Sequence, residues 1–158
     1  MIATSFVIAS LLAGNNATQC TMNPLPLAVD AVRASKDVKS FVVASPKSMS
    51  LLLKDGTLIR VASMGCVDSG SVAHIWVNNP PPAEDEVAWR KLFIRIASAA
   101  FDPIDSKNFA AWLPSAKFTR TDRFILSAGI SENVDLSIDV EPLIDERSAE
   151  ITMSVTYH

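Results

Sequence analysis

The chain has 158 residues, of which 49% are hydrophobic and 20% charged, and it carries a formal net charge of −3. This length suits one domain with a substantial core and is too short for two ordinary ones. The negative net charge argues against a protein whose main task is to bind nucleic acid, because such proteins usually carry an excess of Lys and Arg that contact phosphates.

The first residues have the pattern of an export signal. Ile2 to Gly14 is a mostly apolar run, close to the length of a signal-peptide core and shorter than the roughly 20 residues that span a bilayer. Small and polar residues follow and favour cleavage after Ala17, although no Lys or Arg precedes the run. We therefore expect a signal peptide over 1–17 and a mature domain over 18–158, periplasmic or secreted, with no stable membrane insertion. A buried N-terminal helix or strand and an uncleaved anchor are the alternatives.

Cys20 and Cys66 are the only cysteines. An even number of cysteines in an exported chain predicts a disulfide, which would tie the new N-terminus to the domain. Two unpaired buried thiols are the alternative if the chain is not exported. Two cysteines and two widely separated histidines lack the spacing of a zinc site, so we expect no metal.

The first half of the chain predicts a helix followed by strands. Apolar residues at helical spacing favour a helix over 27–39, and Phe41 then opens a strand that stops near Pro46. Two apolar runs within 50–62 flank Asp55-Gly56, the pair that best tolerates a tight hairpin turn. A third strand is expected over 71–77.

The second half repeats this order. Prolines 80–82 end the sheet segment, and an amphipathic helix runs from the acidic residues after them to Ala100, where Asp102-Pro103 stops it. A short helical piece is expected over 106–113, and a strand over 123–130. Apolar and polar residues then alternate over 134–141 and 151–157, as in strands with one buried face.

These elements predict an α+β fold. We expect one antiparallel sheet of about six strands with helices packed on one face, in the order helix, strands, helix, strands. The sequence does not specify the strand order.

Acidic residues are concentrated near the C-terminus, with seven acidic residues and one Arg between Glu132 and Glu150. Asp135, Asp139 and Glu141 alternate along one strand and would form an acidic stripe on its outer face. We expect this stripe, or the loop around Asp68, to bind a protein partner with a basic surface. The alternative is a solvated strand face that keeps the protein soluble.

No local pattern indicates catalysis or a cofactor. Neither a phosphate-binding loop, a dinucleotide fingerprint nor a zinc-protease motif occurs. Cys66 and His74 would form a nucleophilic pair only if a free Cys66 thiol lay beside the His74 imidazole. The simpler interpretation is that Cys66 belongs to a disulfide and that His74 has a structural role. The three tryptophans, Trp76, Trp89 and Trp112, would line a ligand pocket only if they faced one between sheet and helix.

The sequence therefore favours an exported protein-binding module without catalytic residues or cofactor. An inhibitor or immunity-type protein that occludes an enzyme or toxin fits this description. The alternatives are a hydrolase whose site is assembled from scattered residues, and a small-molecule carrier.

Overall fold

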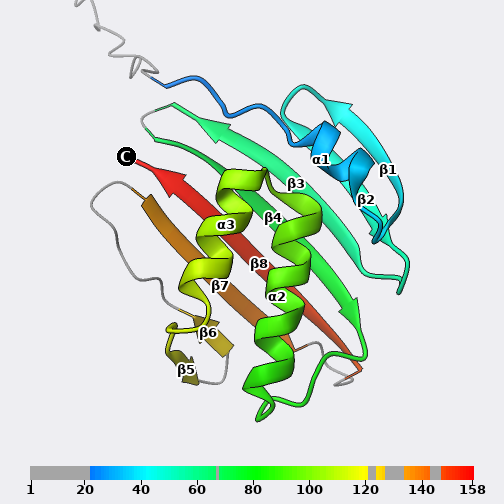
Figure 1. Ribbon diagram of the computed structural model, residues 1–158, viewed down its shortest axis with the longest axis vertical. Helices are drawn as coiled ribbons and strands as arrows, with labels where there is room; N and C mark the ends of the chain where they lie inside the picture. The colour runs from blue at the N-terminus through cyan, green and yellow to red at the C-terminus, as the bar shows by residue number, and fades with distance from the viewer. Residues whose placement is uncertain (1–21, 67, 121–123, 127–133, 143–146) are drawn as a thin grey trace, which may run out of the picture.

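The computed structural model describes residues 22–66, 68–120, 124–126, 134–142 and 147–158 (Figure 1). The predicted signal peptide over 1–17 and Cys20 lie outside the described residues.

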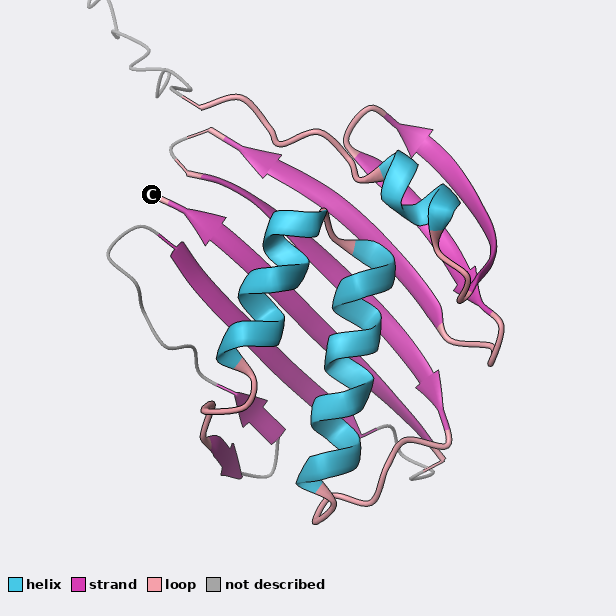
Figure 2. Cartoon of the chain, viewed as in Figure 1, coloured by secondary structure: helices cyan, strands magenta, loops and turns pink. Residues whose placement is uncertain are grey.

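The described elements form one antiparallel sheet with helices on one face (Figures 1 and 2). The eight strands are, in chain order, β1 (Val38–Ser45), β2 (Ser48–Leu53), β3 (Leu58–Gly65), β4 (Ser69–Asn78), β5 (Phe118–Arg120), β6 (Phe124–Leu126), β7 (Val134–Pro142) and β8 (Ser148–Tyr157). The three helices are α1 (Val29–Ala34), α2 (Glu86–Ala100) and α3 (Pro103–Trp112). This confirms the predicted α+β fold, with six longer strands and two strands, β5 and β6, of only three residues each.

The strands lie in the order β1-β2-β3-β4-β8-β7-β6-β5, and each pair is antiparallel. The sheet thus consists of two four-stranded meanders, β1 to β4 and β5 to β8. The helices α2 and α3 connect the end of β4 to the far edge of the sheet. The second meander then returns, so that β8 lies beside β4 in the centre.

The hairpin between β2 and β3 forms where the sequence predicted it. Gly56 adopts a φ of 90°, which a residue with a Cβ rarely tolerates, and one carboxylate oxygen of Asp55 accepts a hydrogen bond from the Thr57 amide at 3.0 Å. The turn therefore depends on both residues of the Asp-Gly pair.

The helix predicted over 27–39 is wrong in its second half. The helix α1 has six residues and ends at Ala34, and Ser35 is already extended. Val38, which shares the helical spacing, instead opens β1 and pairs with Leu53. So short a helix gains little stability of its own, and pairing with β2 decides the conformation of the β-branched Val38.

Two aspartates begin the long helices. Asp85 caps α2 by accepting a hydrogen bond from the Ala88 amide at 2.9 Å. Asp102 caps α3 by accepting from the Ile104 and Asp105 amides, and Pro103 occupies the first turn. Asp102-Pro103 therefore starts a helix, α3, directly after α2 ends, so the predicted piece over 106–113 begins three residues earlier.

The core lies between these helices and the sheet. Phe93 and Ile96 of α2 are fully buried, as are Ile75 of β4 and Ile151 of β8. In Figure 1, α2 and α3 lie over β4, β8 and β7, whereas α1 lies over the strands of the first meander. The alternation predicted for the last two strands is confirmed by β7 and β8, whose apolar residues face this core. Of the strand predicted over 123–130, the described part is β6 alone.

Candidate functional site

None of the described helices covers the second face of the sheet, which we call the open face. On β2, β3, β4 and β8, buried residues alternate with partly or fully exposed ones. The buried residues contribute to the core, so their neighbours along each strand point to the open face. Among the described residues, this face therefore has no second layer of helices or strands.

Cross-strand register shows which residues are neighbours on the open face. One row runs from β7 to β2 and consists of Glu141, Glu150, Trp76, Leu58 and Leu52. The next row consists of Asp139, Thr152, His74, Arg60 and Ser50. Opposing residues on adjacent strands are close enough for their side chains to interact. The face therefore changes from acidic on β7 to apolar and basic on β3.

Large apolar side chains gather on the β3 side of this face. Trp76 is partly buried beside Leu58, which is 43% exposed, and Met64 is also exposed on β3. Arg60 lies exposed between Leu58 and Met64 along the same strand. Tryptophan, methionine and arginine are the residue types that protein interfaces favour, whereas scattered single apolar residues are common on any surface.

The three predicted stripe residues, Asp135, Asp139 and Glu141, all lie on the open face of β7, and each is partly buried. One carboxylate oxygen of Asp135 and one of Asp139 have no hydrogen-bond partner among the described residues. Glu141 does take part in an interaction. The stripe is thus present, although its residues are less exposed than a freely solvated face would have them.

His158 joins two of the predicted partner-binding residues. Its Nδ1 lies 3.2 Å from a carboxylate oxygen of Asp68, in the loop between β3 and β4, and its Nε2 lies 2.8 Å from one of Asp135. The hydrogen bonds to these carboxylates, that to Asp135 first, raise the pKa of His158 above its ordinary value. A protonated ring donates from both nitrogens, so the protonated form fits this geometry. Nothing in the sequence indicated that these three residues meet.

Cys66 and His74 do not form a nucleophilic pair. His74 pairs with Arg60 across β3 and β4, and six residues of extended chain, roughly 20 Å, separate Arg60 from Cys66. The nearest polar neighbour of the imidazole is the Thr152 hydroxyl, at 3.4 Å from Nδ1. The structure leaves no free cysteine in its described part.

The chain that precedes α1 lies along the end of β3. The Met22 amide donates a hydrogen bond to the Cys66 carbonyl at 2.8 Å, and the Ser63 hydroxyl donates to the Leu25 carbonyl. A Cβ on Gly65 would lie only 2.4 Å from the backbone nitrogen of Pro24, so only glycine permits this approach. Residue 22 is thus fixed beside Cys66.

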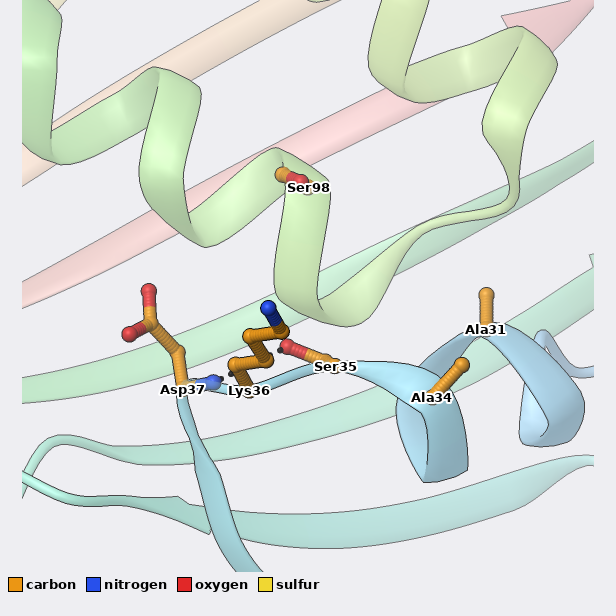
Figure 3. Close-up of a pocket in the computed structure, with 6 residues that line it drawn as sticks. All are labelled: Ala31, Ala34, Ser35, Lys36, Asp37 and Ser98. Atoms are coloured by element: carbon orange, nitrogen blue, oxygen red, sulfur yellow. Dashed lines mark hydrogen bonds between the residues drawn. The ribbon is translucent and has the colours of Figure 1, made fainter.

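The surface hollows near α1 are shallow. One of about 400 Å³ lies between the end of α1 and α2, lined by Ala31, Ala34, Ser35, Lys36, Asp37 and Ser98 (Figure 3). The Ser35 hydroxyl in it accepts a hydrogen bond from the Asp37 amide, and the Asp37 carboxylate contacts Arg95. Ser35 and Asp37 therefore have partners within the protein, and the polar groups of this hollow do not converge on a ligand.

The tryptophans do not surround a pocket. Trp89 is buried against Phe93 with ring centroids 5.6 Å apart, and Trp112 contacts Phe109, whereas Trp76 lies on the opposite face of the sheet. Among the described residues, no three His, Cys, Asp or Glu side chains are placed to hold a metal ion. No described helix is long and apolar enough to cross a membrane.

Comparisons with protein-family models, with curated proteins and with solved structures found no match to this chain.

Proposed function

We propose that this chain is a protein-binding module that uses the open face of its sheet. The observation that carries this proposal is the row in which Trp76 lies beside Leu58 on one side and Glu150 on the other. An apolar centre with a charged rim is the usual arrangement of a protein interface. The shallow hollows and the polar groups within them favour a protein partner over a small ligand.

The charges of the face define the kind of partner. Asp135, Asp139 and Glu141 are partly exposed along β7 on this face, and Glu150 adds a further charge beside Trp76. A partner with basic side chains around an apolar contact would complement them. An inhibitor or immunity-type protein that covers the active site of a basic enzyme or toxin meets this requirement.

The test compares matched variants of the two faces. Leu58→Ser with Met64→Ser, both at exposed apolar positions of the open face, is expected to weaken binding of a captured partner by at least about tenfold. Ile104→Ser, a control on the helix face where Ile104 is 68% exposed, should leave the dissociation constant unchanged. Isothermal titration at two salt concentrations measures both effects.

Charge reversal then tests the acidic stripe itself. Replacing Asp139 and Glu141 with lysine is expected to weaken binding and to remove most of its salt dependence. Equal affinity of the open-face variants and the helix-face control would refute the proposal. If the Leu58 and Met64 variant loses affinity but the Asp139 and Glu141 variant binds as the wild type does, the open face is supported and a basic partner is contradicted.

We also propose that the protein is exported and that Cys20 forms a disulfide with Cys66. Support comes from the apolar run over 2–14 and from the hydrogen bond that fixes Met22 to Cys66, two residues from Cys20. A disulfide needs Cα atoms roughly 4.4–6.8 Å apart, which so short a connection allows.

Mass spectrometry of the protein recovered outside the cytoplasm tests this directly. The expected mass is that of residues 18–158 less two hydrogen atoms, and reduction should restore them. Cys66→Ser serves as the control that cannot form the bond. An intact chain that begins at Met1 and carries two alkylatable thiols would contradict both parts of the proposal.

A further inference from the structure

Among the described strands, β1 forms the long unpaired edge of the sheet. In the part of the chain that the structure describes, β1 has eight residues and pairs only with β2, whereas the opposite edge strand, β5, has three residues. Between its irregular ends, β1 keeps regular register with β2 from Ser40 to Val43. Its outward backbone groups can therefore pair with another extended chain.

Apolar side chains are exposed on both faces of this edge. Val42, on the open face, is 66% exposed, and Val43, on the helix face, is 45% exposed. Beside them, a hollow of about 340 Å³ between α1 and β1 is lined in part by Val32, Val38 and Phe41. An added strand would cover the two valines and place an apolar side chain in this hollow.

Three lysines surround the same edge. Lys36 precedes β1, Lys39 is its second residue, and Lys47 follows it, and all three are exposed. None of them forms an ion pair with a described carboxylate. The two nearby acids are already engaged, because Asp30 pairs with Arg33 and Asp37 with Arg95. The edge therefore carries uncompensated positive charge.

We propose that the outer edge of β1 binds an extended, acidic segment of a partner protein as an additional strand. The positive charge selects this occupant over a second copy of the chain. Two β1 strands placed side by side would bring their lysines together without a carboxylate between them, and lysines on an edge strand oppose such self-pairing. An acidic segment would receive both the backbone hydrogen bonds and the complementary charge.

A designed peptide tests the edge without knowledge of the natural partner. The probe is a fluorescein-labelled heptapeptide of alternating Glu and Val, measured by fluorescence anisotropy against the purified protein. We expect saturable binding, weakened at least about tenfold when Lys36, Lys39 and Lys47 are all replaced by glutamate. Lys91→Glu, an exposed lysine on α2, is the matched control and should bind the peptide as the wild type does.

Backbone pairing is tested separately from charge. Methylating alternate amides of the peptide blocks the hydrogen bonds of one of its two edges and leaves every side chain in place. One set of methylated positions should abolish binding and the complementary set should not. Equal loss with both sets, equal binding of a Lys-Val peptide, or concentration-dependent self-association without peptide binding would each overturn the proposal. The open-face variant at Leu58 and Met64 should still bind the peptide, so this result is independent of the proposed function.

Discussion

Replacing Arg90 with alanine is expected to lower the free energy of unfolding by about 3 kcal/mol. Arg90 extends from α2 and donates hydrogen bonds to the Leu113 carbonyl and, at 2.8 Å, to the Ala116 carbonyl. Its guanidinium also lies 4.4 Å from the centre of the Phe118 ring, and Glu86 lies 3.3 Å away. Alanine would leave both carbonyls without their donor and remove the contact with the ring.

This position requires the planar guanidinium group of arginine, which donates to two carbonyls and also contacts the Phe118 ring. A lysine carries the same charge on a single nitrogen and cannot lie flat on the ring while reaching both carbonyls. We therefore expect Arg90→Lys to recover less than half of the lost stability. Lys91→Ala, at the exposed neighbouring position, should change it by less than about 0.5 kcal/mol. Urea denaturation measures all three, and a loss below about 1 kcal/mol for Arg90→Ala would show that α3 and β5 do not depend on this residue.

Asp105→Asn is expected to stabilise the protein relative to the wild type, and this gain in the free energy of unfolding should be larger at neutral pH than at acidic pH. Asp105 is 1% exposed, and it accepts a hydrogen bond from the Tyr157 hydroxyl at the end of β8. Burial raises the pKa of Asp105 to about 6, the Tyr157 hydrogen bond opposes this rise, and the charge of Asp102 adds to it. The neutral carboxyl is thus the form that the fold prefers.

The sign of the pH effect follows from this raised pKa. Between the ordinary value of 3.8 and about 6, the unfolded chain loses its proton while the folded protein keeps it. Asp105 therefore makes its full contribution to the free energy of unfolding below pH 3.8. As the pH rises from 3.8 to about 6, the free energy of unfolding falls by about 3 kcal/mol in total. Asparagine does not titrate. The free energy of unfolding of the variant, relative to that of the wild type, should therefore rise by about this amount between pH 4 and 6.5.

Thermal and urea denaturation across this pH range measure the difference. Asp102→Asn is the companion variant, because asparagine still caps α3 but removes the charge that raises the pKa of Asp105. In Asp102→Asn, the pKa of Asp105 in the folded protein should be lower than in the wild type. The stability of this variant should therefore fall over a narrower pH range. A difference between Asp105→Asn and the wild type that stays constant from pH 4 to 6.5 would contradict the assignment.

Local signals in the sequence were sufficient for the elements that depend on local interactions. The Asp55-Gly56 turn, the apolar face of α2 and the alternation of β7 and β8 each follow from one or two neighbouring residues or from a short period. The strands β5 and β6 are too short to show such a period. Val38 was misassigned because its helical spacing is real but its pairing with Leu53 is stronger.

The candidate site was predictable only in part. The alternation along β7 correctly placed Asp135, Asp139 and Glu141 on one face, because a single strand determines that geometry. The neighbours of Trp76 depend on strand order, which the sequence does not specify. The link from His158 to Asp68 depends on β8 lying beside β4, a contact between distant parts of the chain.

The central position of β8 has a consequence for how the molecule acquires its structure. Ser69 of β4 pairs with Tyr157 of β8, and both helices of the core and the other strands of the second meander lie between them in sequence. Contacts this distant form slowly, because a long loop must close before they stabilise anything. The sheet cannot be completed until residue 157 has left the ribosome, although β1 to β4 can pair with one another before then. For the export proposed above, a chain that has not yet completed its sheet is the form that a translocation channel can thread.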